Sequence, residues 1–342
     1  MPERGHLRGS NHRAHHGGSA LLRGIVGLAL ASLIACAGAG LSPMEKQATA
    51  SGPRGEFELG LQYLAGAGVE RDQVKAVEWI RKAAEQGYAP AQVKLGELYY
   101  FGEGVPKDPQ RTVEWTRKAA VAGDSQGQIA LGWLYLKGHG VARSPEDAVS
   151  WIRKAALQGD PQGQTDLGTM YEMGWGVPKT LSESARWYRE AADQGYALAQ
   201  YNLAIAYRSG SGVQRDPAKA VKWYRKAADQ GLAAAQFGLG ARYASGEGVA
   251  RDTSEAVKWF RKAAEQGDVR AQFTLGAAYA NGDGVPEDLE TAHMWITIAA
   301  SRGNRDAAAV LPSVEQKLTP EQIASSKARA AAWLDAHPVP TR

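Results

Sequence analysis

The side chains that could carry chemistry are few, and their spacing does not assemble a reaction centre. Four of the seven histidines lie within the first 16 residues, and the others, His139, His293 and His337, lack the spacing of metal ligands. Cys36 is the only cysteine, which excludes an intramolecular disulfide and a cysteine-based metal site. No Gly-x-Ser-x-Gly motif, Cys–His pair or pair of catalytic carboxylates stands out. We therefore expect no enzyme, no metal site and no cofactor.

The one residue with an expected chemical role is Cys36. Residues 1–23 are polar and basic, and the apolar stretch 24–35 that follows has about half of the ~20 residues that a membrane span needs. This stretch ends in Leu-Ile-Ala-Cys, which resembles the bacterial lipobox, where a signal peptidase cuts before a cysteine that carries diacylglycerol. We expect residues 1–35 to be a signal peptide and Cys36 to carry the lipid. Ala37 favours sorting to the outer membrane, with the protein facing the periplasm.

Two other interpretations of this segment stay open. Small residues around positions 35–39 also suit ordinary signal cleavage, which would give a soluble periplasmic protein, and the apolar stretch could instead remain as an uncleaved anchor. After the cysteine, residues 36–54 are rich in Pro, Ser and Gly and are predicted to be a flexible tether.

The charge balance gives no reason to expect nucleic-acid binding. The chain has a formal charge of +4, but residues 1–35 contribute +3 of it, so the remainder carries only +1. A nearly neutral chain lacks the basic surface that binds DNA or RNA.

A regular spacing of tryptophan organises the rest of the chain. Seven tryptophans recur at a constant interval of 36 residues: Trp79, Trp115, Trp151, Trp187, Trp223, Trp259 and Trp295. A fixed period of this length is typical of a solenoid of helix pairs, in which each unit buries its apolar face against its neighbours. The predicted units are 55–90, 91–126, 127–162, 163–198, 199–234, 235–270 and 271–306, and the tryptophans are expected to fill the volume between them.

The unit 91–126 illustrates the pattern. Its first helix carries apolar and small residues on one side, and a Gly-x-Gly-Val loop at 102–105 ends it, since glycine takes a left-handed conformation at low cost. Asp108 is then the predicted N-cap of the second helix, which ends at Gly123. The equivalent caps in the other units are Asp72, Ser144, Thr180, Asp216, Asp252 and Asp288.

This pattern resembles the Sel1-like repeat, a relative of the tetratricopeptide repeat with a longer interhelix loop. The motif Ala-Gln-x-x-Leu-Gly-x-x-Tyr-x-x-Gly-x-Gly-Val-x-x-Asp, followed by Ala-x-x-Trp and Lys-Ala-Ala-x-x-Gly, recurs over about 250 residues with few departures. The resemblance implies an all-α, right-handed superhelical solenoid of seven helix-turn-helix repeats over 55–306. It also implies a protein that assembles complexes.

The pattern decays over residues 307–342. Pro312 occupies the position of a repeat glycine, and Thr319 followed by Pro320 is a typical helix start. We expect a degenerate repeat and a helix that reaches Trp333 and caps the open end of the stack.

The candidate binding surface follows from a helical wheel of the first helix. The positions equivalent to 94, 97 and 101 lie opposite the repeated apolar positions, and in tetratricopeptide repeats this side lines a concave groove. Large residues occupy it in the early units, whereas small ones such as Ser209, Gly238 and Ala277 occupy it later. The candidate partner-binding residues are Lys94, Glu97, Tyr100, Phe101, Trp133, Lys137, Thr169, Met173 and Trp175. The alternative is that these residues pack against the next unit.

These residues suggest three functions. The leading one is a non-enzymatic scaffold of the bacterial envelope that binds a protein partner and is tethered to the membrane by lipid. The second is binding or export of envelope polysaccharide, with Tyr100, Trp133 and Trp175 stacking on sugar rings. The third is a β-lactam-interacting enzyme, which some cysteine-rich relatives suggest and which the absence of cysteine from the repeats disfavours.

The second helices also repeat an Arg-Lys pair, for example Arg81-Lys82 and Arg225-Lys226. Such a ladder could grip acidic polysaccharide or lipid headgroups. We favour a solvated outer face offset by neighbouring acidic residues.

Overall fold

The computed structural model describes residues 41–338, and all the regular secondary structure in this range is helical. Cys36 and the predicted signal peptide 1–35 lie outside the described residues. The chain divides into two compact units at residues 155 and 156, within one helix, and each unit is considered by itself. The predicted all-α repeat fold is confirmed.

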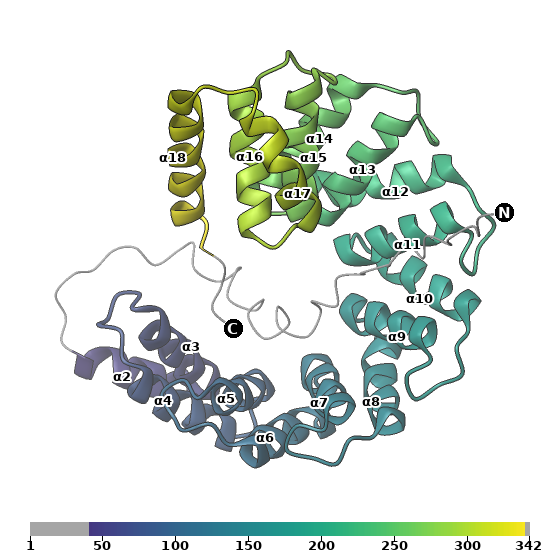
Figure 1. The fold of residues 1–342 in the computed structure, drawn as a ribbon. Helices are drawn as coiled ribbons and strands as arrows, with labels where there is room; N and C mark the ends of the chain where they lie inside the picture. The colour runs from purple at the N-terminus through teal and green to yellow at the C-terminus, as the bar shows by residue number, and fades with distance from the viewer. Residues whose placement is uncertain (1–40, 339–342) are drawn as a thin grey trace. The chain divides into compact units, whose positions relative to one another are not determined.

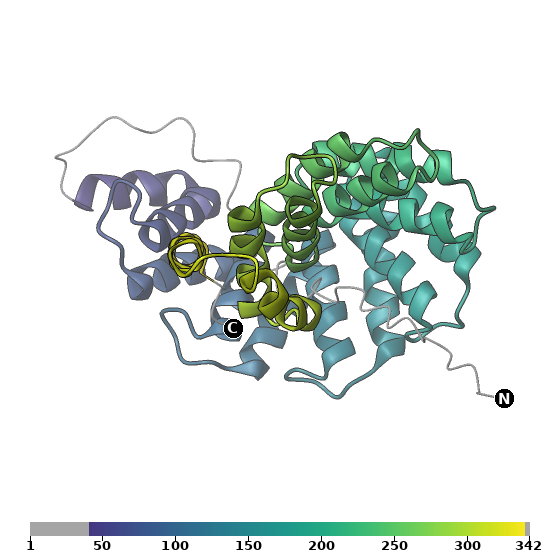
Figure 2. The ribbon, with the colours of Figure 1, turned by 45° about the horizontal axis from the view of Figure 1, so that its top comes forward.

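Both units are series of helices joined by short turns and loops, and Figures 1 and 2 show successive helices lying side by side. The first unit contains α2 (Leu41–Ala50), α3 (Gly52–Ala65), α4 (Gln73–Glu85), α5 (Ala89–Phe101), α6 (Pro109–Val121), α7 (Ser125–Lys137) and most of α8 (Pro145–Leu157). The second contains α9 (Pro161–Met173), α10 (Leu181–Asp193), α11 (Ala197–Ser209), α12 (Pro217–Asp229), α13 (Ala233–Ser245), α14 (Thr253–Glu265), α15 (Val269–Asn281), α16 (Leu289–Ser301), α17 (Arg305–Glu315) and α18 (Pro320–Ala336).

Each interhelix loop is built on two glycines with different tasks. The first ends the helix: Gly102 has φ +75°, and its N–H donates to the Leu98 carbonyl at 2.8 Å. The second lies against the preceding repeat, because a Cβ on Gly104 would come within 2.3 Å of the Gln73 carbonyl oxygen. The Gly-x-Gly-Val motif therefore both reverses the chain and brings the loop against the neighbouring α4.

The predicted N-caps of the second helices are confirmed with one exception. The Asp72, Asp108, Asp216, Asp252 and Asp288 carboxylates each accept a hydrogen bond from a first-turn amide, and the Ser144 hydroxyl accepts one from the Asp147 amide at 3.2 Å. Thr180 makes no such bond, because its hydroxyl donates instead to the Pro178 carbonyl at 3.1 Å. Thr180 is therefore the N-cap residue of α10, as predicted, but without the predicted hydrogen bond.

The segment predicted to be a flexible tether is helical from residue 41 onward. Ala48 of α2 is buried with Leu59, Tyr63 and Ala76 of the first helix pair, and Met44 packs against this cluster. The prediction of flexibility rested on Pro, Ser and Gly content. It missed the apolar side chains that bring α2 onto α3.

The repeated tryptophans do not all have the same burial. Trp115, Trp187, Trp259 and Trp295 are buried, whereas Trp79, Trp151 and Trp223 are half-buried. A basic side chain of the same helix lies over the indole in six repeats, as Lys154 does at 3.7 Å from the Trp151 ring centroid. The tryptophans are therefore covered partly by these cations, and they pack in core clusters with helices that precede them, as Trp115 does in one cluster with Ile80 and Leu95.

The predicted C-terminal helix, α18, packs on α16. A capping box starts it, in which the Thr319 hydroxyl accepts from the Gln322 amide and the Gln322 side chain accepts from the Thr319 amide. Ala330 is buried in the same cluster as Trp295, and the Trp333 ring lies 5.8 Å from the Trp295 ring. The last repeat is covered in this way.

Candidate binding surfaces

Lys94 and Glu97, on successive turns of α5, form an ion pair at 2.8 Å. Glu97 was predicted to face the groove, but only 4% of its side chain is exposed, so this residue is a correction to the predicted surface. Burial raises the pKa of the Glu97 carboxyl to about 7, although the neighbouring Lys94 ammonium opposes that shift. Glu97 is thus a buried titratable group beneath Lys94.

Tyr100 and Phe101 form an aromatic cluster with a residue that the wheel did not select. Their rings lie 5.0 Å apart, and the His139 ring of the next loop lies 4.6 Å from that of Tyr100. Burial and the nearby Lys137 charge lower the pKa of His139, so its imidazole is neutral at pH 7. Its Nε2 atom is buried and has no hydrogen-bond partner among the described residues.

The remaining predicted residues fall into different places. Trp133 is half-buried and Lys137 is exposed, both on α7 of the first unit. Thr169, Met173 and Trp175 belong to the second unit. The Thr169 hydroxyl lies 3.1 Å from the Tyr188 hydroxyl, the Met173 side chain is 38% exposed and Trp175 is half-buried. The predicted set is therefore not one continuous patch within either unit.

The later repeats hold aromatic side chains that the sequence interpretation missed. Tyr201, Phe237 and Phe273 occupy equivalent positions on α11, α13 and α15, and all three are half-buried. In α5, α7 and α9 the equivalent residues, Val93, Ile129 and Thr165, are buried. Small neighbouring residues leave these rings partly uncovered, and they lie one position before the column equivalent to Lys94, which is the position at which the sequence could have revealed them.

The Arg-Lys ladder is engaged within the repeats. The arginine of a second helix bonds the tyrosine hydroxyl of the next first helix, 18 residues later, as Arg117 does with Tyr135 at 2.9 Å. The same bond joins Arg81–Tyr99, Arg189–Tyr207, Arg225–Tyr243 and Arg261–Tyr279. The lysines are exposed, as predicted, but they also lie over the tryptophan rings, and acidic partners are seen for Lys82 with Glu56 and for Lys118 with Glu114.

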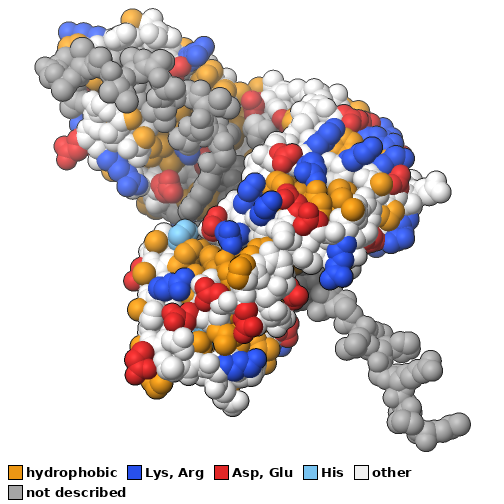
Figure 3. Space-filling view, turned by 90° about the horizontal axis from the view of Figure 1, so that it is seen from above, with side chains coloured by type: hydrophobic (Ala, Val, Ile, Leu, Met, Phe, Trp, Pro, Cys, Tyr) orange, Lys and Arg blue, Asp and Glu red, His pale blue; other side chains and the backbone are white. Residues whose placement is uncertain are grey.

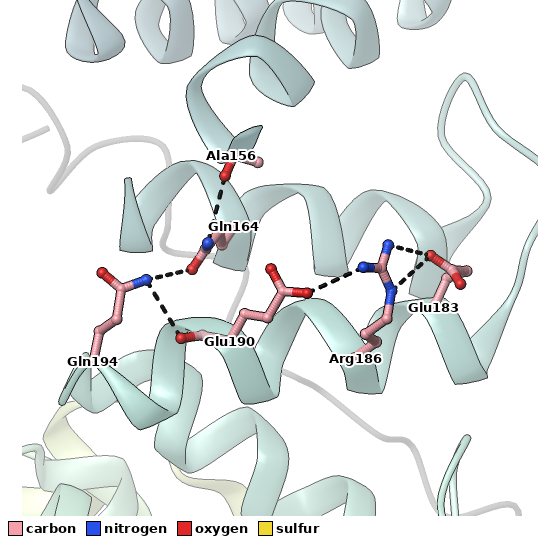
Figure 4. A network of polar contacts seen from close by, with 6 residues as sticks. All are labelled: Ala156, Gln164, Glu183, Arg186, Glu190 and Gln194. Atoms are coloured by element: carbon pink, nitrogen blue, oxygen red, sulfur yellow. Dashed lines mark hydrogen bonds and ion pairs between the residues drawn. The ribbon is translucent and has the colours of Figure 1, made fainter. Parts of the chain in front are cut away.

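A second ladder satisfies carbonyl groups near the ends of the second helices. The buried Gln164 side chain donates to the Ala156 carbonyl at 3.4 Å and accepts from the Gln194 amide at 2.7 Å (Figure 4). Five other glutamines donate to the equivalent carbonyl: Gln92, Gln128, Gln200, Gln236 and Gln272. The repeated glutamine therefore has a structural task, in agreement with the rule that buried polar groups are hydrogen-bonded.

One group of side chains has the composition of a serine-hydrolase triad. His293 Nδ1 lies 2.7 Å from the Ser326 hydroxyl, and His293 Nε2 lies 3.3 Å from Glu315. Both His293 and Ser326 are completely buried, and the hydroxyl donates to backbone carbonyls of its own helix. A buried hydroxyl cannot reach a substrate, so this group joins α16, α17 and α18 instead of forming a reaction centre.

The described part of the chain offers neither a metal-binding cluster nor a membrane-spanning helix. Residues 41–338 contain no cluster of three or more His, Cys, Asp or Glu side chains that could hold a metal ion. No helix in this range is long and apolar enough to cross a membrane. On the face shown in Figure 3, basic and acidic side chains are interspersed with hydrophobic ones.

A family model and a solved structure both relate this chain to Sel1 repeat proteins. A family model described as Sel1 repeat matches residues 53–88, 89–124, 125–160, 161–196, 197–232, 233–268 and 269–304. A Sel1 repeat protein from Oxalobacter formigenes is 37% identical over 79% of this chain and 79% of that chain, with a TM-score of 0.69. No curated protein matches the chain.

Two other solved structures are less similar. A protective antigen of uropathogenic Escherichia coli with an SLR fold is 31% identical over 85% of this chain and 78% of that chain, with a TM-score of 0.40. An immunity protein from Pseudomonas aeruginosa is 26% identical over 64% of this chain and 81% of that chain, with a TM-score of 0.44.

Proposed function

Because the chain belongs to the Sel1 repeat family, we propose that it is a non-enzymatic scaffold of the bacterial cell envelope that binds a protein partner through its first unit. The observation that carries this proposal is the aromatic cluster of Tyr100, Phe101 and His139. Tyr100 and Phe101 belong to α5 and His139 belongs to the loop after α7, so the cluster is held by two repeats. Aromatic side chains supported in this way are typical anchors of protein interfaces.

The proposed surface also contains charged side chains. Lys137 is exposed, and Lys94 covers the carboxylate of Glu97. Half-buried aromatic residues beside basic side chains suit a protein surface better than a small-molecule pocket, since interfaces combine aromatic cores with polar rims. We include Trp133 in the surface because α7 carries both it and Lys137.

The place of action follows from the amino-terminal sequence. A lipid on Cys36 would tether the repeats to a membrane, with the outer membrane favoured and the repeats in the periplasm. A single acyl chain binds a membrane weakly, whereas the diacylglycerol of a lipoprotein gives a lasting anchor. Labelling cells with a radioactive or clickable fatty acid tests this part: the wild type should be labelled, and Cys36→Ser should not.

The partner is tested by photo-crosslinking in living cells. A photoreactive residue at position 133 should give one discrete protein adduct, which mass spectrometry then identifies. The matched control is the same residue at Lys222, which is exposed on α12. An adduct from both positions, or from neither, would contradict binding through this surface. A crosslink to polysaccharide at position 133 would support the glycan-binding alternative in place of a protein partner.

A further inference from the structure

We propose that the second unit carries a separate docking surface, on the exposed side of α11, α13 and α15, for a protein segment that combines apolar and carboxylate side chains. This surface is distinct from the cluster around Tyr100, which lies in the first unit. Three features support this proposal. A series of aromatic side chains is partly exposed, an arginine occupies a position that is apolar in other repeats, and basic side chains outnumber acidic ones around the rings.

The apolar part begins on α11. Leu198, Tyr201 and Ile205 are spaced by three and four residues, so they lie on one side of the helix, and Leu198 is 37% exposed. The repeat continues this side with Phe237 on α13 and Phe273 on α15. All of these side chains are at least partly exposed, whereas the first-unit equivalents of the three aromatic residues, Phe57, Val93 and Ile129, are buried. A run of uncovered apolar side chains of this kind marks an interaction site in a soluble domain.

The aromatic rings are fixed in place before any partner arrives. The Tyr201 ring lies 5.9 Å from that of Tyr224, and the Phe237 ring lies 5.6 Å from that of Phe260. A Cβ at position 238 would come within 2.7 Å of the Tyr224 ring, so glycine is required for this packing. Anchors that are already ordered lose little conformational entropy on binding.

Arg242 is the residue that departs most from the repeat. Its equivalents in α5, α7 and α9 are the buried apolar residues Leu98, Leu134 and Met170. The Arg242 side chain is only 13% exposed, it pairs with Glu247, and its Nε atom is buried without a hydrogen-bond partner among the described residues. An arginine at a core position with an unsatisfied donor costs stability, which suggests a task other than folding.

The charges around the rings favour an acidic occupant. Glu247 also binds Arg215 at 2.5 Å, so two arginines share one carboxylate. Arg208 has no ion pair with a described carboxylate. Burial raises the pKa of the Tyr224 hydroxyl, and the nearby charges of Arg208 and Arg242 oppose that rise. Arg270 lies over the Phe237 ring at 4.6 Å and is balanced by Asp268. The surface therefore has four arginines and two carboxylates, and a second copy of the same surface would be repelled.

Selection from a phage-displayed library of random 16-residue peptides tests this inference on the purified full-length chain. The enriched peptides should be rich in Asp and Glu together with Leu, Phe or Trp. Their affinity, measured by fluorescence anisotropy, should fall at least tenfold in Arg208→Glu and in Phe237→Ser. Arg242→Leu restores the residue type of the other repeats, so it should fold at least as well as the wild type and still lose affinity.

The controls separate this surface from the first one. Lys222→Glu makes the same charge change as Arg208→Glu on the exposed side of α12, and Trp133→Ala alters the first unit; neither should affect the enriched peptides. Enrichment of neutral or basic peptides, or of none, would overturn the inference. So would retained affinity in the Arg208 and Phe237 variants with unchanged circular dichroism. Self-association that these variants abolish would assign the surface to a second copy and would equally overturn it.

Discussion

At the scale of single residues, Glu97 is the side chain whose protonation is expected to affect the stability of the fold most directly. Its carboxyl is buried and its pKa is raised to about 7, whereas an exposed glutamate titrates near 4.5. The folded state therefore holds this proton more tightly than the unfolded state. The stabilising contribution of the protonated group is complete below the unfolded pKa and is lost as the pH rises through about 7.

Glutamine cannot ionise, so we predict that Glu97→Gln does not lose stability as the pH rises in the way that the wild type does. The free energy of unfolding of the variant, relative to that of the wild type, should rise by up to about 3 kcal/mol between pH 4.5 and pH 8, since one pKa unit corresponds to ~1.4 kcal/mol. Urea unfolding at several pH values measures the difference. Glu114→Gln is a control, because its carboxylate is in an exposed ion pair with Lys118. Parallel pH profiles for Glu97→Gln and the wild type would contradict the prediction.

Glu97 and Tyr201 also show that the burial of a single side chain could not be predicted from the sequence. A helical wheel gives the direction of a side chain, but it does not give the size of the neighbours that cover it. Glu97 points to the predicted side and is buried beneath Lys94, whereas Tyr201 lies at the edge of that side and is left partly exposed by small neighbours. The cap residues and glycines were predictable because their conformations depend on a few adjacent residues.

At the scale of helices and loops, the two types of glycine should differ in their tolerance of alanine. Gly212 has φ +72°, and a Cβ there would lie 1.9 Å from the Leu181 carbonyl oxygen. Gly231 ends a second helix with φ +89°, and a Cβ there would meet no atom within 4 Å. Both positions carry the cost of a left-handed alanine, and only Gly212 adds a collision with the backbone of the preceding repeat.

We therefore predict that Gly231→Ala costs about 1–2 kcal/mol, whereas Gly212→Ala costs roughly 3 kcal/mol or more because the loop must move away from α10. Denaturant unfolding of the two variants measures both values. Equal losses at the two positions would show that the loop does not depend on its close approach to the preceding repeat.

Among the helices, the tryptophan period predicted the pairs correctly but overstated what the tryptophans do. The repeats are also joined by arginine–tyrosine and glutamine–carbonyl bonds. These bonds involve residues that appear in the repeated motif, yet nothing in the motif says which of them meet. Partners separated by 18 residues on different helices become visible only when the helices are packed.

At the scale of the whole molecule, α18 determines how the last repeat is protected. It covers α16 through Ala330 and Trp333, and it is held by the buried contact of Ser326 with His293. A repeat protein needs such a terminal cover, because its last unit has no following neighbour.

We predict that truncation after residue 318 lowers the melting temperature and exposes apolar surface, with ANS fluorescence and concentration-dependent association as the readouts. Truncation after residue 338 is the control, because it leaves all of α18 in place. If the shorter chain stays monomeric, does not bind ANS and melts at the same temperature as the control, α18 is dispensable as a cap.

The arginine–tyrosine bonds have a consequence for how such a chain can change in evolution. Each bond joins a residue to one 18 positions later, and its equivalents recur at intervals of 36. Recombination between corresponding points of two repeats would therefore restore every contact of this type in the product. Genes of this kind can gain or lose 36 codons, or a multiple of 36, without a defective intermediate, whereas an in-frame change of any other length would misalign the bonds on one side of the junction.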